Sequence, residues 1–319
     1  MILLYHRVSR LRRDPWRLCL TPEQFASQMS FLRENTDPIS LTDLENAPRS
    51  RRRPAVAVTF DDGYDDNLIE AEPVLRHYGI PATIFVVSGM MTAGREFWWD
   101  DLERILLNPG DRPREEQIMI RGQPTILPRL SIPNELDDEG WCAWQGTPPS
   151  AAHRLYSDLH QALLPLSYLE RDSILATMRD WAGVPPEARA SHRPLDCAQL
   201  RQLVQSPAID VGVHTVTHPN LAALPEREQR HEIVVARADI ERITGQRSGL
   251  FSYPYGKREH FSERTVSIVR SEGFQCACAN IPGRVRPHTD RLQLPRIVAP
   301  ALGNAEFAHW FSHCLRDSE

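Results

Sequence analysis

Short apolar runs alternate with amphipathic stretches along the first part of the chain. The runs at residues 2–5, 55–60 and 82–87 are almost entirely apolar, which predicts buried strands. The stretches at 22–34 and 67–78 predict helices between them. Strands that are separated by helices in this way imply a parallel sheet with helical crossovers.

Capping residues support both predicted helices. Thr21 is placed to cap the first helix, Pro22 occupies its first position, and Gln24 completes a capping-box pattern. The second stretch is predicted as helical despite Pro73, and Gly79 follows it as a C-cap.

The same alternation returns in the last third of the chain. The stretch at 226–243 places Ile233, Ala236 and Ile240 on one face of a predicted helix, and Gly245 closes that helix. The other elements predicted here are a helix at 263–271 and strands at 209–213, 250–253, 274–279 and 292–298.

The middle of the chain, at about residues 94–191, breaks this rhythm. It is rich in Pro, Trp and charged residues, and it contains helical stretches at 102–107 and 169–181. We interpret it as an insertion or subdomain within one domain that spans residues 1–319, and not as a separate catalytic domain.

The net charge of the chain bears on which classes of function are expected. The 319 residues include 42 Asp and Glu against 37 Lys and Arg, for a formal net charge of −5. This balance argues against broad nucleic-acid binding. The basic run at residues 49–53 has no interleaved aromatic residues, so a solvated loop is favoured over an anion-binding patch.

Cysteine usage and hydropathy bear on the compartment. The six cysteines are scattered without zinc-ribbon spacing, and a chain of this length needs no disulfide framework. The apolar run at 2–5 is too short for a signal peptide, and no segment reaches transmembrane length. We therefore expect a cytoplasmic protein in a reducing compartment; the sequence sets no oligomeric state.

Two short segments carry the candidate chemistry. Asp61 and Asp62 come directly after a predicted strand, and His214 and His218 lie four residues apart after another. Pro219 follows at once, so we expect the histidines on a strand end and a loop and not on a helix. Carboxylate oxygens and imidazole nitrogens together can hold a catalytic divalent metal with one position open for water.

Three motifs surround these residues. They read Thr-Phe-Asp-Asp-Gly-Tyr at 59–64, His-Thr-Val-Thr-His at 214–218 and Ser-Tyr-Pro-Tyr-Gly at 252–256. In these motifs the chain resembles the polysaccharide deacetylase family, also called the NodB-homology or carbohydrate esterase family 4 group. The resemblance covers both ends of the chain and leaves out the middle segment.

The resemblance implies a fold and a reaction. The fold is an α/β distorted (β/α)7 TIM-like barrel, here with a large insertion on its rim. The implied activity is removal of N- or O-acyl groups from sugars with one divalent metal ion, usually zinc. Catalytic residues of such barrels lie at the carboxyl ends of the strands.

The resemblance also implies residue roles. Asp62, His214 and His218 would hold the metal, and Asp61 would act as the general base towards metal-activated water. The backbone N–H of Tyr255 would stabilise the oxyanion.

Two positions depart from the family pattern. Ser252 stands where the family often has an Arg that orients the base. Arg296 stands where the last motif, here Leu-Gln-Leu-Pro-Arg at 292–296, normally ends in the His that serves as general acid. Arg cannot deliver a proton near neutral pH, because its pKa is above about 12.

Three hypotheses follow from these departures. Arg296 has taken over the orientation of the base, or it binds a phosphate or carboxylate of the substrate. His6 lies at the end of the first predicted strand and either acts as the missing acid or only packs there. The third hypothesis is that the chain is an inactive variant. The resemblance places Tyr64 and Pro254, in the first and third motifs, beside the substrate.

The expected function is a metal-dependent hydrolase that removes an N-acyl group, acetyl or formyl, from a sugar. The expected substrate is a nucleotide-linked, lipid-linked or small amino-sugar glycoside. Two alternatives stay open: a cyclic amide or imide hydrolase on the same fold, and a non-catalytic carbohydrate-binding protein on a degenerate deacetylase scaffold. Retention of Asp61 argues against the last, because pure binding needs no base.

Tryptophans of the middle segment have two interpretations. Trp98, Trp99, Trp141 and Trp144 either pack the core of a subdomain, which is the commoner fate of such residues, or stack on sugar rings.

Overall fold

The structure is a computed structural model that describes residues 1–44, 53–133 and 141–316. Residues 49–52 of the basic run lie outside this part of the chain. The chain divides into two compact units. Unit 1 comprises Met1–Leu11, Leu18–Ala93 and Pro194–Glu319, and unit 2 comprises Arg12–Arg17 and Gly94–Arg193.

Unit 1 is built on a parallel sheet in which every neighbouring pair of strands runs the same way. The strand order is β13-β12-β11-β6-β5-β1-β14, with β4 paired to β5 beside this path. The strands are β1 (Ile2–Tyr5), β4 (Asp37–Pro38), β5 (Ala55–Phe60), β6 (Ala82–Val86), β11 (Ile209–Val213), β12 (Leu250–Ser252), β13 (Cys276–Cys278) and β14 (Ile297–Val298). The predicted strands are therefore present, with ends shifted by no more than two residues except in the last, which is shorter than predicted.

One short segment brings the two edges of this sheet together. Leu294 pairs in parallel with Cys278 of β13, while Ile297 and Val298 pair with β1. The sheet thus curls into the expected distorted barrel, and seven strands of the described residues follow one another around it. The strand predicted at 292–298 is shorter than expected, because Pro295 has no N–H to donate to a sheet ladder.

The two faces of the curled sheet bury different clusters. Alternate residues of each strand point to opposite faces. Leu3, Val58 and Ile84 pack outward in the cluster that includes helix residues such as Phe25 and Met29. The interior cluster comprises Ile2, Leu41, Ala57, Phe85, Leu250, Cys276, Cys278 and Leu294.

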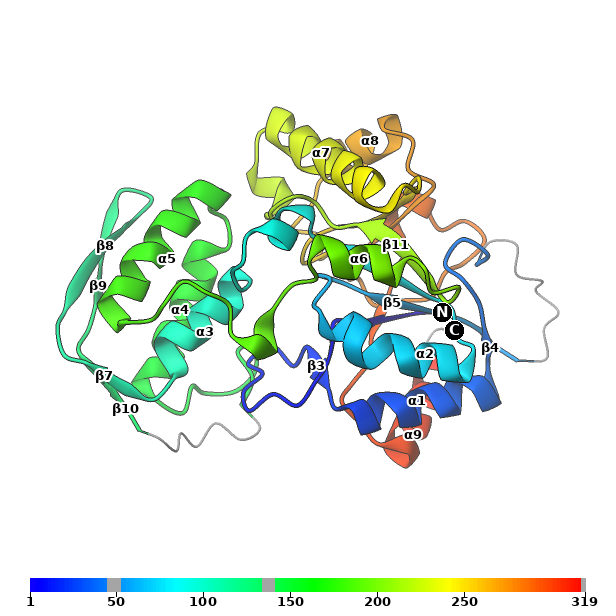
Figure 1. Ribbon diagram of the computed structural model, residues 1–319, viewed down its shortest axis with the longest axis horizontal. Coiled ribbons are helices and arrows are strands. Elements are labelled where there is room, and N and C mark those ends of the chain that lie inside the picture. Colours follow the sequence, from blue (N-terminus) through cyan, green and yellow to red (C-terminus); the bar gives the residue numbers. More distant parts are fainter. Residues whose placement is uncertain (45–52, 134–140, 317–319) are drawn as a thin grey trace. The chain divides into compact units, whose positions relative to one another are not determined.

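Helices surround the barrel of unit 1. They are α1 (Pro22–Asn35), α2 (Glu72–Tyr78), α6 (Cys197–Leu203), α7 (Glu226–Thr244), α8 (Glu263–Ser271) and α9 (Asn304–Arg316), with short turns η2 (Ser88–Thr92), η4 (Leu221–Ala223) and η5 (Arg291–Gln293). Figure 1 shows α1 beside α2 and α9, and α7 beside α8. No helix in the described ranges is both long and apolar enough to cross a membrane.

Local sequence signals explain how these helices begin. Thr21 and Gln24 form both hydrogen bonds of the predicted capping box at the start of α1. The helix predicted at 67–78 begins instead with a π-helical turn, η1 (Asn67–Ala71), and becomes α-helical at α2. Pro73 accounts for the change, because it cannot donate the hydrogen bond that a regular helix needs there.

Unit 2 combines helices with two small antiparallel strand pairs. Its elements are α3 (Trp98–Leu107), α4 (Ala151–Leu163), α5 (Tyr168–Ala182), the turn η3 (Ala190–His192), and strands β7 (Gly110–Arg112), β8 (Glu116–Ile120), β9 (Gln123–Leu127) and β10 (Leu130–Ile132). β7 pairs with β10 and β8 with β9, each antiparallel. Neither pair was predicted. The remaining strands, β2 (Arg7–Val8) and β3 (Cys19–Leu20), pair with each other in unit 1.

The tryptophans of unit 2 divide between two environments. Trp98 and Trp99 are buried and belong to the core, which agrees with the packing interpretation. Trp144 is 50% exposed, and its ring stacks on that of Trp16 with 5.9 Å between centroids. Trp141 is half-buried and packs edge-on against His153, with 4.5 Å between ring centroids. Of the four predicted rings, that of Trp144 is the most exposed and fits the alternative of contact with a ligand best.

Candidate metal centre and general base

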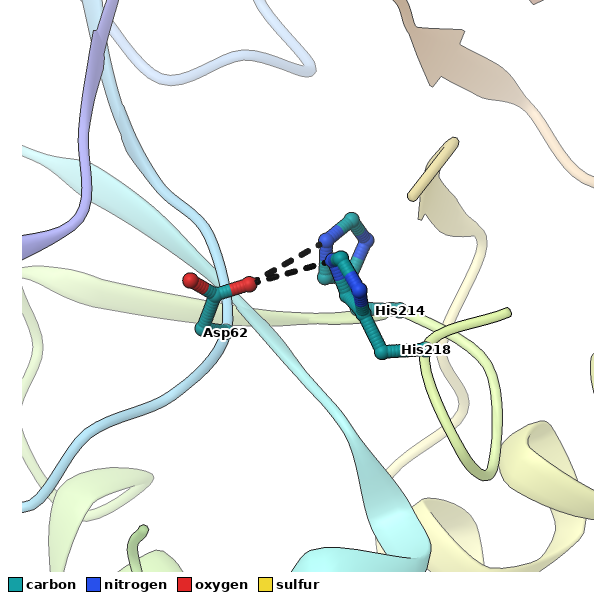
Figure 2. Close-up of side chains that lie close together, drawn as sticks. All are labelled: Asp62, His214 and His218. Atoms are coloured by element: carbon teal, nitrogen blue, oxygen red, sulfur yellow. Dashed lines mark ion pairs between the residues drawn. The ribbon is translucent and has the colours of Figure 1, made fainter. Parts of the chain in front are cut away.

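Three predicted metal ligands converge at the ends of two barrel strands. Asp62 follows β5, His214 follows β11, and His218 lies in the loop after His214. The Oδ1 atom of Asp62 is 3.6 Å from Nε2 of His214 and 3.3 Å from Nε2 of His218. Figure 2 shows this one carboxylate oxygen directed at both rings. All three side chains are buried.

This arrangement fits a divalent metal ion. Nitrogen and oxygen ligands in a tetrahedral zinc site lie about 2.0–2.2 Å from the ion, which puts neighbouring ligand atoms about 3.3–3.5 Å apart. The two distances from Asp62 are close to that spacing. One ligand atom from each of Asp62, His214 and His218 lies within 4.8 Å of the others.

Neighbouring groups orient the two imidazoles. His214 Nδ1 lies 2.8 Å from the carbonyl oxygen of Ser252, which can only accept, so the ring donates there and leaves Nε2 free of its proton. A metal-binding histidine needs this tautomer. The ring of His218 packs edge-on against Tyr255, with 4.6 Å between centroids.

The backbone at the site is left-handed at several non-glycine residues. The φ angle is +73° at Asp62, +68° at Thr215, +53° at His218 and +59° at Tyr255. Each such residue costs about 1 kcal/mol or more, and such strain concentrates at functional sites. At Asp62 it has a direct result: a regular strand would turn Asp61 and Asp62 to opposite faces, whereas the left-handed turn lets both face the barrel end.

Asp61 is held by a buried arginine. Nη1 of Arg296 donates to Oδ1 of Asp61 over 2.7 Å, and Nη2 donates to Oδ2 over 2.6 Å. The other guanidinium contacts are Nη2 to Ser252 Oγ at 2.9 Å, Nη1 to Thr59 Oγ1 at 3.3 Å and Nε to Ala279 O at 3.1 Å. These bonds use the five N–H donors that an Arg side chain offers.

Charge sets the ionisation of both carboxyls. Burial raises the pKa of Asp61, but the Arg296 guanidinium outweighs it and holds that pKa below its ordinary value. Burial also opposes ionisation of Asp62, but the imidazoles of His214 and His218 that face it outweigh burial and bring its pKa well below the usual range. Both carboxyls are therefore ionised at neutral pH.

His6 lies within electrostatic reach of the same cluster. Its ring is partly buried, and burial lowers its pKa, while the charges of Asp62 and Asp61 act in the opposite direction. Nδ2 of Asn67 donates to the His6 carbonyl oxygen over 2.8 Å, which fixes the backbone at the end of β1.

The three predicted substrate-binding residues are all buried. Tyr64 is covered by the guanidinium of Arg7, which lies 4.0 Å from the ring centroid. Arg296 is fully buried and paired with Asp61, and Pro254 is buried directly before Tyr255. The contacts of these three residues with a substrate stay predictions that the geometry does not favour.

Thr59 was missed as part of the site. Its hydroxyl contacts Arg296 and donates to the carbonyl oxygen of Leu3 over 2.8 Å. The signal was present in the sequence, because Thr59 and Asp61 alternate on one strand and so face the same side.

Comparison with known proteins supports the family resemblance. The family model for polysaccharide deacetylase matches residues 49–109 and 185–277. The matched stretches contain the Asp-Asp and His-x-x-x-His motifs. The resemblance drawn from these motifs is therefore confirmed: over the matched residues the chain is similar to the polysaccharide deacetylase family.

A curated relative agrees with this assignment over a limited stretch. The putative polysaccharide deacetylase YxkH of Bacillus subtilis (strain 168) is 33% identical over 91 residues, which make up 27% of this chain and 31% of that protein. The chain thus spans less than a third of the relative that it matches.

Solved structures show the same fold over nearly the whole chain. The Streptococcus pyogenes deacetylase PplD, solved with acetate, aligns with a TM-score of 0.58 at 16% identity, covering 97% of this chain and 96% of that one. IcaB from Ammonifex degensii aligns with a TM-score of 0.57 at 18% identity, covering 98% and 95%. At these identities the comparison establishes the fold alone, and the expected barrel is confirmed.

Proposed function

We propose that this protein is a metal-dependent carbohydrate deacylase that hydrolyses the N-acyl group, acetyl or formyl, of an amino sugar. The observation that carries the proposal is the different pairing of two adjacent carboxylates. Asp62 faces two imidazoles at distances typical of ligands of one metal ion, while Asp61 accepts two hydrogen bonds from Arg296. A binding protein would need neither a ligand set nor a separately held base.

In this proposal Asp62, His214 and His218 hold the metal, and zinc suits their donor atoms. A divalent ion held there would polarise the acyl carbonyl and acidify a bound water. The Nδ1 contact of His214 with the Ser252 carbonyl keeps the ring in the tautomer and orientation that this role requires.

Asp61 is the general base of the proposal. Two parallel hydrogen bonds from Arg296 fix the plane of its carboxylate, and the Ser252 hydroxyl donates to Oδ2 over 3.1 Å. Fixed orientation favours proton transfer, because a base must lie within hydrogen-bond reach of the proton that it takes. In this proposal Arg296, directly before β14, orients the base, which is one of the sequence hypotheses.

Two further groups complete the proposed chemistry. The backbone N–H of Tyr255, on its left-handed turn, would donate to the oxyanion. His6 would protonate the leaving amine. Because burial lowers the pKa of His6, its ring is neutral at pH 7 and must first gain the proton that it delivers. The nearby carboxylates favour that gain.

The acid role of His6 has a direct test. Replacement of His6 by Ala is expected to lower kcat by about 10²–10⁴-fold, the usual contribution of a general acid. The measurement is the rate of acyl release at saturating substrate with the metal content determined in parallel. An unchanged rate would remove His6 from the mechanism.

The function itself is tested by acyl release from sugars. Zinc-reconstituted protein is assayed for acetate and formate release from N-acylated nucleotide sugars, lipid-linked sugars and small glycosides. Asp61→Asn is expected to retain the metal and to react about 10²–10⁴-fold more slowly. Sugar binding without release would favour the non-catalytic scaffold. Ring opening of cyclic imides, without acyl release from any sugar, would favour the alternative hydrolase.

A further inference from the structure

The loop between the two histidines is held along one side by the turn η2. The backbone N–H of Ser88 donates to the carbonyl oxygen of Thr215 over 3.0 Å, and that of Gly89 donates to Val216 over 2.9 Å. The approach is so close that a Cβ atom on Gly89 would lie 2.6 Å from the Val216 oxygen. This position therefore admits no side chain unless the loop shifts.

The other side of the same loop is held by one carboxylate from helix α7. Glu232 accepts hydrogen bonds from the backbone N–H groups of Val216 and Thr217, each over 2.8 Å. It also accepts a bond from the Thr217 hydroxyl over 2.7 Å. Glu232 is only 8% exposed. Three donors on one buried carboxylate make a strong, charge-assisted contact.

The loop needs such support because its conformation is unfavourable by itself. Thr215 and His218 are both left-handed, and Thr215 is β-branched, which makes a positive φ especially costly. The Thr215 hydroxyl accepts a hydrogen bond from the His218 N–H over 3.1 Å, which stabilises the turn locally. The surrounding contacts must supply the rest.

We propose that Glu232 is a positioning residue for the candidate metal centre. Its carboxylate binds residues 216 and 217 and so holds the loop of residues 215–217 in contact with Ser88 and Gly89. The loop conformation in turn sets the spacing of the Nε2 atoms of His214 and His218. The inference rests on the proposed function, because it concerns the same metal site. Groups that orient metal ligands in this way affect metal affinity by about 10–100-fold.

The test measures cobalt(II) binding to metal-free protein, because the visible spectrum of bound cobalt reports coordination geometry. Glu232→Ala is expected to weaken binding about 10–100-fold and to change the spectrum. Glu232→Gln is expected to restore most of the affinity, since its amide oxygen can still accept both backbone N–H groups. Apo-protein unfolding is recorded for each variant.

Glu241→Ala is the matched control on the same helix. The Glu241 carboxylate also accepts from a backbone N–H, that of Ser248 over 3.1 Å, and from Arg237 Nε over 3.1 Å, but it does not touch the histidine loop. Its loss is expected to lower stability while the cobalt affinity and spectrum stay those of the wild type.

The outcomes separate this inference from the proposed function. Wild-type affinity in Glu232→Ala, with stability lowered as in the control, would overturn the positioning role alone. Failure of the wild-type protein to bind cobalt would overturn both. If Glu232→Ala does not fold, Thr217→Val removes one of the three hydrogen bonds; weaker binding would support the inference, and unchanged binding would contradict it.

Discussion

The barrel end of unit 1 and the helical core of unit 2 both bury carboxylates beside basic side chains. In unit 2, Arg189 donates to Glu96 and to Glu103, each over 2.7 Å, and Arg179 pairs with Asp101. In unit 1, Arg296 pairs with Asp61 in a similar way, but the neighbouring carboxylate faces imidazoles. Both regions therefore bury charge. They differ in the partner of the carboxylate, which is an arginine guanidinium in unit 2 and, for Asp62 in unit 1, a pair of histidine imidazoles.

Backbone conformation separates the two regions further. Among the described residues with positive φ that are not glycine, Arg17 and Arg121 belong to unit 2, and the rest lie at the barrel end. Arg121 sits in the turn between β8 and β9, where such geometry is ordinary. Left-handed backbone strain, together with a carboxylate that faces imidazoles and not an arginine, therefore marks a functional site better than buried charge alone does.

The largest expected difference between the two regions is metal binding, which should depend on the histidines at the barrel end. His218→Ala is expected to abolish binding of about one divalent ion per chain and, with it, acyl release. His160→Ala is the matched control in unit 2, since His160 is equally buried between the rings of Trp16 and Trp98. Elemental mass spectrometry after zinc reconstitution decides. Metal retained by His218→Ala would contradict the ligand assignment.

The two arginine clusters give the next largest difference. Arg296→Met is expected to lower kcat by about 10²-fold through misorientation of Asp61. Since the guanidinium lowers the pKa of Asp61, its loss is also expected to raise that pKa and to move the acid limb of the pH–rate profile to higher pH. Steady-state rates over about four pH units upward from the ordinary carboxyl pKa of about 4 measure both effects.

The partner experiment in unit 2 is Arg189→Met. Removal of this cation leaves Glu96 and Glu103 poorly compensated, which is expected to cost about 3–5 kcal/mol of stability. Metal affinity is expected to stay unchanged. Denaturant unfolding and metal titration of the same sample measure the two quantities. A loss of metal affinity equal to that of His218→Ala would show that the two regions do not differ as proposed.

The smallest effect is expected at Ser252. Its hydroxyl donates to Asp61 and accepts from Arg296, but the bidentate pair remains when it is removed. Ser252→Ala is therefore expected to cost about 1 kcal/mol, or less than about tenfold in kcat. A loss as large as that of Arg296→Met would mean that the hydroxyl, and not the guanidinium, fixes the base.

Local patterns in the sequence predicted most of the barrel. The strands β5 and β11 have the predicted bounds, and so does α8, because each is bounded by strong caps or turns next to a clear apolar pattern. The antiparallel strand pairs of unit 2 were not predicted. Their strands are short and carry exposed apolar residues such as Met119 and Ile126, so the hydrophobic alternation that marks a half-buried strand is weak.

The site was only partly predictable for a related reason. Asp61, Asp62 and the two histidines stand in compact motifs, so spacing alone pointed to them. The pairing of Arg296 with Asp61 joins residues 235 positions apart, and one of several hypotheses anticipated it. Glu232 gave no signal, because its role comes from a backbone contact and not from a motif.

The segment that closes the barrel also carries Arg296. Leu294 donates to the Ala277 carbonyl on one side, and Ala299 donates to Leu4 on the other. Orientation of the base consequently depends on the hydrogen bonds that residues 294–299, the closing seam of the barrel, make with the strands on both sides. A fluctuation that opened this seam would release the guanidinium from Asp61 while the remaining strands stayed paired. Activity would then report local closure of the barrel, and hydrogen exchange at the Ala299 amide should follow the same equilibrium.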